Sequence, residues 1–184
     1  DDSEMLVLLY EFKNDLDAYL GALGPKAPVH SLADVIAFNE SHREQEMPWF
    51  GQDIMLKAQA KGPLSSKEYL EALENNHKFA RTEGVDAVMG KHRLDALVAP
   101  TAGPAWTTDL INGDHAAGGS STPAAVAGYP NINVPAGYAW GLPVGISFFG
   151  AANSEALLIK LAYAFEQATQ HRRAPQFRAS ASLG

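Results

Sequence analysis

The chain has 184 residues, 46% of them hydrophobic and 19% charged, and its formal net charge is −7. This composition is typical of a soluble globular protein of one domain, and the acidic balance without a basic run argues against direct nucleic-acid binding. The absence of cysteine excludes disulfides and thiolate chemistry, and since no apolar run reaches about 18 residues, no membrane span is expected. These properties leave the compartment open, with the cytoplasm favoured.

Helical patterns fill the first half of the chain. Apolar residues recur at spacings of four and three near the N-terminus, which predicts an amphipathic helix. This predicted stripe consists of Met5, Leu9, Phe12, Leu16 and Tyr19. Ser31 is a suitable N-cap for a short helix over residues 32–39, and a further short helix is expected over 53–60.

A longer helical pattern extends from the middle of the chain to His92. Ser65 and Glu68 have the spacing of a capping box, in which each side chain satisfies a free backbone N–H at the start of a helix. Gly84 lies inside this pattern, so we expect the helix to pause or bend there.

From Leu94 the pattern changes to short apolar runs. Residues 94–101 fit a buried strand that ends near Pro100, and a long loop rich in Gly, Pro and Thr follows. A short helical segment is expected near 122–128. The runs 131–137 and 142–150 carry β-branched residues between Gly and Pro, which predicts two more strands.

This order of elements predicts an α/β fold, with a mixed sheet edge and flanking helices, and Asn153 as the N-cap of the last helix. Three strands are few for a self-sufficient sheet, so we interpret them as the edge of a larger one, through which the chain could also self-associate. The start at Asp1, without an initiator Met or signal peptide, indicates a truncated or processed chain. We expect residues 1–175 to form this domain portion and 176–184 to be a disordered tail.

Ser120 and Ser121 are the first candidates for chemistry. A serine hydroxyl is a weak nucleophile until a base takes its proton. Asp114 and His115 are the nearest partners along the chain, but residues so close in sequence rarely converge to a triad, and there is no G-x-S-x-G elbow. Ser121 suits a helix N-cap because Pro123 follows it closely. We therefore interpret both serines as turn, capping or substrate-lining residues.

The other polar residues predict no metal or cofactor site. The six histidines show no H-x-x-H or H-E-x-x-H spacing, and the glycine pairs lack the pattern of a phosphate-binding loop. Asp109 and Asp114 lie in the long loop without an evident partner for acid–base work. We assign no metal ligand, no cofactor and no catalytic residue.

Several segments, taken together and in order, resemble the C-terminal part of the amidase signature enzymes. Two upstream stretches, SLADVIAFN and GQDIMLKA, resemble the region that precedes those segments. The four principal segments are HRLDALVAPT (92–101), AAVAGYPNINVPAG (124–137), GLPVGISFFG (141–150) and SEALLIKLAYAFEQA (154–168).

The resemblance implies a larger amidase signature fold, without metal or cofactor, that hydrolyses carboxylic amides to acid and ammonia or amine. Members use a Ser–Ser–Lys triad that lies upstream of the matched region. GGSSTPAAVAG echoes the serine-bearing signature, yet Thr122 and Pro123 stand where that signature continues with glycines and its nucleophile. None of the triad residues is therefore carried onto this chain, which is expected to be inactive alone and to need the missing N-terminal part as its partner.

By the same resemblance, the loop over residues 101–121 should lie near a pocket for a small-molecule or peptide amide. Trp106 is expected either to form an apolar wall or to pack in the core. The expected substrate-lining residues are Thr101, Trp106, Asp114, His115, Ser120 and Ser121.

Two alternatives remain open. One is the amidase-like component of a glutamyl-tRNA(Gln) amidotransferase, its A subunit, which shares the fold and the triad. The segment PWFGQDIMLKA lacks the Arg-x-x-Gly-Phe-Gly-like pattern expected upstream in that component, which favours a stand-alone amidase. The other is a complete non-catalytic α/β binding domain, for which a closed sheet with an internal pocket would be expected.

Overall fold

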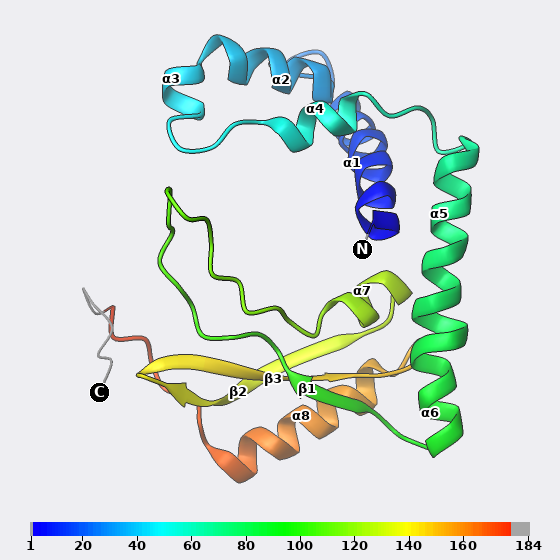
Figure 1. Ribbon diagram of the computed structural model, residues 1–184, viewed down its shortest axis with the longest axis vertical. Coiled ribbons are helices and arrows are strands. Elements are labelled where there is room, and N and C mark those ends of the chain that lie inside the picture. Colours follow the sequence, from blue (N-terminus) through cyan, green and yellow to red (C-terminus); the bar gives the residue numbers. More distant parts are fainter. Residues whose placement is uncertain (1, 178–184) are drawn as a thin grey trace. The chain divides into compact units, whose positions relative to one another are not determined.

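The computed structural model describes residues 2–177 and divides into two compact units, residues 1–76 and 77–184, which are described separately (Figure 1). The first unit contains α1 (Asp2–Ala22), α2 (Leu32–Ser41), α3 (Arg43–Glu46), α4 (Asp53–Gln59) and α5 (Lys67–His77), whose last residue belongs to the second unit. The second contains the π-helix η1 (Lys78–Val85), α6 (Asp86–His92), β1 (Leu97–Pro100), α7 (Thr122–Ala127), β2 (Asn131–Ala139), β3 (Leu142–Phe149) and α8 (Glu155–Thr169). None of the helices within residues 2–177 has both the length and the apolar character needed to span a membrane. Most of the predicted tail, residues 178–184, lies outside the described residues.

The first unit is stabilised by two small apolar clusters that share α1. On one side Val7 and Tyr10 pack against Tyr69 and Ala72 of α5, and on the other Leu9 packs against buried residues of α2 and α4. Burial of each large apolar side chain contributes about 1.5–3 kcal/mol. Because α1 is covered on two sides, its predicted stripe is wrong in part. The stripe residues that remain exposed are Met5, Phe12 and Tyr19.

A reciprocal pair of tyrosine–carboxylate hydrogen bonds joins α1 to α5. The Tyr10 hydroxyl donates to Glu68 Oε2 and the Tyr69 hydroxyl donates to Glu11 Oε1, each at 2.8 Å, with the two rings 5.4 Å apart. Glu68 therefore serves a tertiary contact. The predicted capping box with Ser65 is wrong, since α5 begins later, at Lys67.

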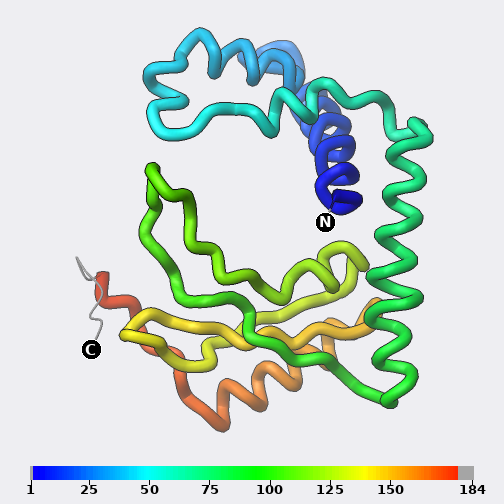
Figure 2. The backbone as a smooth tube through the Cα atoms, viewed as in Figure 1, coloured from blue at the N-terminus to red at the C-terminus, as the bar shows by residue number. Residues whose placement is uncertain are grey.

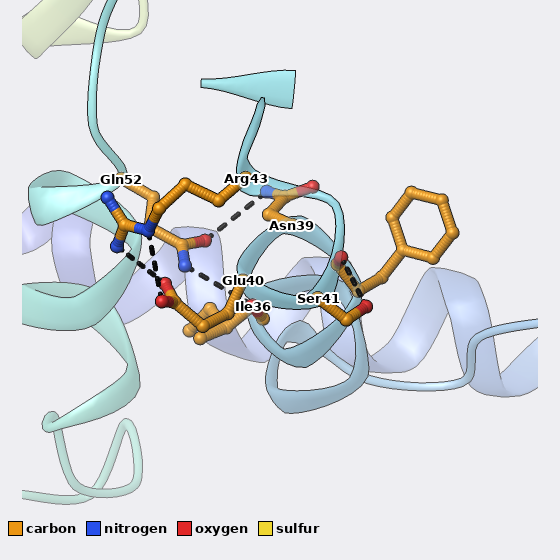
Figure 3. A network of polar contacts seen from close by, with 7 residues as sticks. Ile36, Asn39, Glu40, Ser41, Arg43 and Gln52 are labelled. Atoms are coloured by element: carbon orange, nitrogen blue, oxygen red, sulfur yellow. Dashed lines mark hydrogen bonds and ion pairs between the residues drawn. The ribbon is translucent and has the colours of Figure 1, made fainter. Parts of the chain in front are cut away.

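A polar network holds the segment before α4 against α2 (Figure 3). Asn39 donates to Gln52 Oε1 at 3.3 Å, and Gln52 Nε2 donates to the carbonyl oxygen of Ile36 at 3.2 Å. Arg43 donates to both carboxylate oxygens of Glu40, at 3.0 and 2.7 Å. These hydrogen bonds lower the pKa of Glu40, although an ion pair this exposed adds little stability.

The second unit is built on an antiparallel sheet with strand order β1-β3-β2. One face packs against α8, where Phe148 meets Leu158 and Ala162. The opposite face is covered at one end by η1, α6 and α7, where Phe149 meets Val85 and other apolar residues (Figure 1). The predicted α/β class with flanking helices and the three predicted strands are confirmed.

The predicted helix caps have different outcomes. Ser31 is confirmed, because its hydroxyl accepts a hydrogen bond from the backbone N–H of Asp34 at 3.2 Å. Asn153 is wrong as the cap of α8. It adopts a left-handed conformation with φ of 61°, and Ser154 occupies the N-cap position while its hydroxyl donates to the carbonyl oxygen of Ala151.

The predicted pause at Gly84 is confirmed. Its backbone angles, φ −106° and ψ −111°, are non-helical and lie inside the π-helix η1. A Cβ added there would collide with the carbonyl oxygen of Phe79, so only glycine fits without a backbone shift.

We expect Gly84→Ala to destabilise the protein by about 1–3 kcal/mol, because the new methyl group overlaps a backbone oxygen. Gly90→Ala in α6 is the matched control, since nothing lies within 4 Å of its added Cβ. There the gain in helix propensity should leave stability unchanged or raise it by about 0.5–1 kcal/mol. Urea unfolding of both variants checks this, and equal effects would contradict the role of Gly84.

We expect the stabilising contribution of Tyr69 to depend on alkaline pH. Burial and then the Glu11 carboxylate raise the pKa of Tyr69 to about 12, above its ordinary value of 10.0. The folded state therefore favours the neutral phenol, whose contribution is complete below pH 10 and is lost as pH rises from 10 to 12. At neutral pH, Tyr69→Phe should cost about 1–3 kcal/mol, and this difference should shrink across that window. A difference that stays constant in urea unfolding from pH 8 to 12 would contradict this assignment.

Candidate functional site

The loop over residues 101–121 leaves the sheet and returns to it at one place, the end of β1 (Figure 2). Thr101 extends the ladder of β1 by donating its backbone N–H to the carbonyl oxygen of Gly145 at 2.9 Å. Its own carbonyl oxygen accepts from the backbone N–H of Ser120 at 3.0 Å, next to an antiparallel bridge between Ala102 and Gly119. The structure therefore brings together two of the predicted site residues, Thr101 and Ser120.

Uncharged polar side chains gather around this point. The hydroxyl oxygens of Thr101 and Ser147 lie 2.9 Å apart, and Ser147 is only 2% exposed. Asn133 is the β2 residue directly opposite Ser147 in the sheet, so the two side chains share a face. A Cβ added to Gly145 would lie 2.7 Å from both terminal atoms of Asn133 and 2.9 Å from Thr101 Oγ1. We call Thr101, Ser120, Asn133 and Ser147 the hydroxyl–amide cluster.

The hydroxyl of Ser120 is enclosed and without a partner. Its Oγ atom is shielded from solvent and has no hydrogen-bond partner within the described residues. A buried hydroxyl without a partner carries a free-energy cost of about 1–3 kcal/mol. No histidine, lysine or carboxylate among residues 2–177 forms a hydrogen bond or ion pair with this cluster. The described residues thus supply neutral hydrogen-bonding groups there, but no base that would activate a serine.

The other predicted site residues lie outside this cluster. Trp106 is 45% exposed and lies outside the apolar clusters of the described core, so the interpretation as a core residue does not hold for the described residues and its role as an apolar wall stays a prediction. Asp114, His115 and Ser121 are exposed. The His115 Nε2 atom lies 4.0 Å from an oxygen of Asp109, at the limit of an ion pair, and His115 is mostly in solvent.

Asp109 organises the far end of the loop. Its carboxylate accepts hydrogen bonds from the backbone N–H groups of Ile111 and Asn112 and from the Asn112 side chain, at 2.9–3.0 Å. These bonds, led by the one from the Asn112 backbone, lower the pKa of Asp109. The side chain of Ile111 is left 92% exposed at the tip. Asp109 thus has a structural role in shaping the turn.

The helix α7, which starts next to the serine pair, is anchored at its other end by Arg81. Arg81 Nε donates to the carbonyl oxygen of Ala127 at 2.7 Å, and its guanidinium lies over the ring of Tyr129 at 5.7 Å. Gly128 has a φ of 66° and ends α7 in a left-handed cap. Ser121 occupies the predicted N-cap position, although its side chain makes no capping hydrogen bond.

Sequence reasoning missed Asn133, Gly145 and Ser147. The alternation in NINV and GIS places Asn133 and Ser147 on one face of their strands, which was a usable signal. Their pairing depends on the register of β2 and β3, which includes an irregularity between Pro135 and Gly137 that the sequence pattern does not reveal.

The family of the chain follows from comparison with known proteins. Residues 5–159 match the amidase family, so the chain belongs to the amidases. It is 44% identical over 179 residues to a probable amidase of Arabidopsis thaliana, and this match covers 96% of the chain but 31% of the relative. The chain thus spans about a third of the length of the curated relatives that it matches over most of its length.

A solved structure matches nearly the full length of the chain. The native peptide amidase of Stenotrophomonas maltophilia shares 45% sequence identity with the chain at a TM-score of 0.86, covering 97% of this chain and 35% of that one. A shorter match is to the A subunit of the glutamyl-tRNA(Gln) amidotransferase of Desulforudis audaxviator, 50% identical over 48 residues, or 26% of this chain and 10% of that protein.

We expect Arg81→Ala to destabilise the attachment of α7 by about 1.5–3 kcal/mol, because a hydrogen bond from a charged donor is lost. Arg81→Lys should recover little, since an ammonium group cannot both reach Ala127 in the same geometry and stack on Tyr129. Arg43→Ala is the control, because Arg43 forms only an exposed ion pair with Glu40.

Urea unfolding and hydrogen exchange of the Gly128 and Tyr129 amides check this prediction, since both amides bond to carbonyls of α7. Faster exchange at these two positions in Arg81→Ala is expected. An unchanged exchange rate, or an equal loss of stability in Arg43→Ala, would contradict the anchoring role.

Proposed function

We propose that the protein containing this chain is an amidase signature hydrolase, and that these residues shape its substrate site. The observation that carries the proposal is the match over nearly the whole chain to the peptide amidase of Stenotrophomonas maltophilia. The reaction is the hydrolysis of a carboxylic amide to a carboxylic acid and ammonia or an amine. By the same similarity, we propose a peptide amide as the substrate.

The residues of the chain support a positioning role. Acyl transfer requires a nucleophile with its base, donors for the developing oxyanion, and contacts that hold the reacting carbonyl beside them. Ser120 and Ser121 have no base among the described residues, so we place the triad outside these 184 residues, on the part of the protein that precedes them. The loop over 101–121 and the hydroxyl–amide cluster would then provide contacts to the substrate.

Within this proposal the six predicted lining residues have different roles. Thr101 would present the polar wall at the end of β1, and Ser120 would support it through the hydrogen bond from its backbone N–H to Thr101. Trp106 would offer an apolar surface, since it is 45% exposed. Asp114, His115 and Ser121 would contact the substrate only if it extends along the exposed side of the loop.

The two alternatives have less support. The match to the amidotransferase component of Desulforudis audaxviator covers 26% of the chain, whereas the amidases match over nearly all of it. A non-catalytic binding domain is disfavoured by membership of the amidase family. We therefore keep amide hydrolysis as the proposed function.

The test is to purify the gene product from its source, determine its intact mass, and assay it with an acetylated dipeptide amide. Release of ammonia by a product much heavier than these 184 residues, with the isolated chain inert, is the expected result. Failure of the purified product to release ammonia from any peptide amide would sink the proposal. Hydrolysis by the isolated chain would return Ser120 and Ser121 as candidate nucleophiles.

A further inference from the structure

The sheet face opposite α8 has two unlike halves. At one end Leu97, Ala99 and Phe149 lie with Val85 and Ala124 in an apolar cluster under η1 and α7. Along the same strands, toward the loop over 101–121, this face carries the hydroxyl–amide cluster. The change from apolar to polar takes place within two residues of β3, between Phe149 and Ser147.

Asn133 is the member of the cluster that is free to bind a ligand. It is exposed, and its side-chain amide has no hydrogen bond within the described residues. In contrast, Ser147 is buried and pairs with the Thr101 hydroxyl. Asn133 is therefore the position at which the cluster has unused hydrogen-bonding capacity in reach of solvent.

Gly145 determines how the Asn133 side chain lies. A methyl group at Gly145 would come within 3.0 Å of both the Asn133 amide and the Thr101 hydroxyl. Because glycine has no side chain, these two groups can approach the backbone of β3 at this position from the two neighbouring segments. The φ of Gly145 is not positive, so the requirement for glycine here is one of space and not of backbone conformation. Both terminal atoms of the Asn133 amide and the Thr101 hydroxyl thus border the space above Gly145.

A side-chain carboxamide has the same hydrogen-bonding groups as a peptide bond, N–H donors and a C=O acceptor. It can therefore accept a hydrogen bond from the N–H of a substrate peptide bond, or donate one to its oxygen. A trans peptide bond presents these two groups on opposite sides, so Asn133 engages one of them, and the N–H is the group that its oxygen would bind. No charged side chain within residues 2–177 bonds to the cluster, so the cluster offers no counter-charge to a carboxylate and offers matched hydrogen-bonding groups to a neutral amide.

We propose that Asn133 is a specificity-determining residue that pairs with an internal peptide bond of the substrate, so that peptide amides are preferred over simple amides. This inference rests on the proposed function, because it assigns the site to the amide substrate. Gly145 leaves the space that the Asn133 amide occupies, and Asn133 itself takes no part in bond cleavage.

The experiment compares Asn133→Ala with Asn131→Ala in the full-length protein that contains this chain. Asn131 is the matched control because it is an exposed asparagine on the same strand and face, two residues away, opposite Phe149. The substrates are an acetylated dipeptide amide and its analogue with an ester in place of the internal peptide bond. For the dipeptide amide, Asn133→Ala should raise KM about three- to tenfold with kcat little changed, the loss expected for one neutral hydrogen bond.

The ester analogue lacks the internal N–H, so Asn133→Ala should affect its KM much less, and Asn131→Ala should affect neither substrate. Equal effects of Asn133→Ala on both substrates, or equal effects of the two variants, would overturn the role of Asn133. Either result would leave the proposed amidase activity standing.

A binding measurement tests the role of Asn133 independently of the proposed amidase activity. The acetylated dipeptide acid, the product of the reaction, retains the internal peptide bond and has no terminal amide to cleave. Its equilibrium binding should weaken about three- to tenfold in Asn133→Ala and not in Asn131→Ala, even if the protein hydrolyses no amide. Unchanged binding in Asn133→Ala, or no binding by the unaltered protein, would overturn the inference.

Discussion

The second unit depends on the hydrogen-bond ladder of β3, the only strand of the described sheet that is paired on both sides. The ladder to β1 continues one residue beyond that strand, through the bond from the Thr101 N–H to the Gly145 carbonyl. This single bond determines where the loop over 101–121 begins, and the bond from Ser120 to Thr101 determines where it ends. Ordering each residue of a loop costs about 1–2 kcal/mol of conformational entropy. Backbone hydrogen bonds at both ends of the loop help to offset this cost and hold the two ends together.

The same strand also explains why polar and apolar groups can share one face. Phe149 and Ser147 are two residues apart on β3 and point the same way, but α7 and η1 cover only the Phe149 end. Ser147 is buried nonetheless, and the Thr101 hydroxyl provides the hydrogen bond that makes its burial tolerable. Arg81 attaches η1 to the end of α7 through its hydrogen bond to the carbonyl oxygen of Ala127, and both elements contribute buried residues to this cover.

Local patterns in the sequence were sufficient for most elements, and insufficient for contacts between them. Ser31 and Gly84 were predictable because a cap and a helix break are decided by neighbours within a few residues. Glu68 satisfied the local rule for a capping box but is used by Tyr10, a residue far away along the chain. Asn133 and Ser147 became neighbours only through strand register, which depends on the irregular pairing of the hairpin and not on either segment alone.

The serine pair shows why a motif needs its surroundings before it implies chemistry. The segment around Ser120 resembles a serine-bearing signature. The Ser120 hydroxyl is nevertheless enclosed, and it forms no hydrogen bond with a base among the described residues. A neutral cluster has a different use, because a matched hydrogen bond favours a ligand that pairs with it over a ligand that leaves a polar group unpaired. Asn133 can contribute to this discrimination only as long as Gly145 has no side chain, so the glycine is as much a part of the recognition surface as the amide beside it.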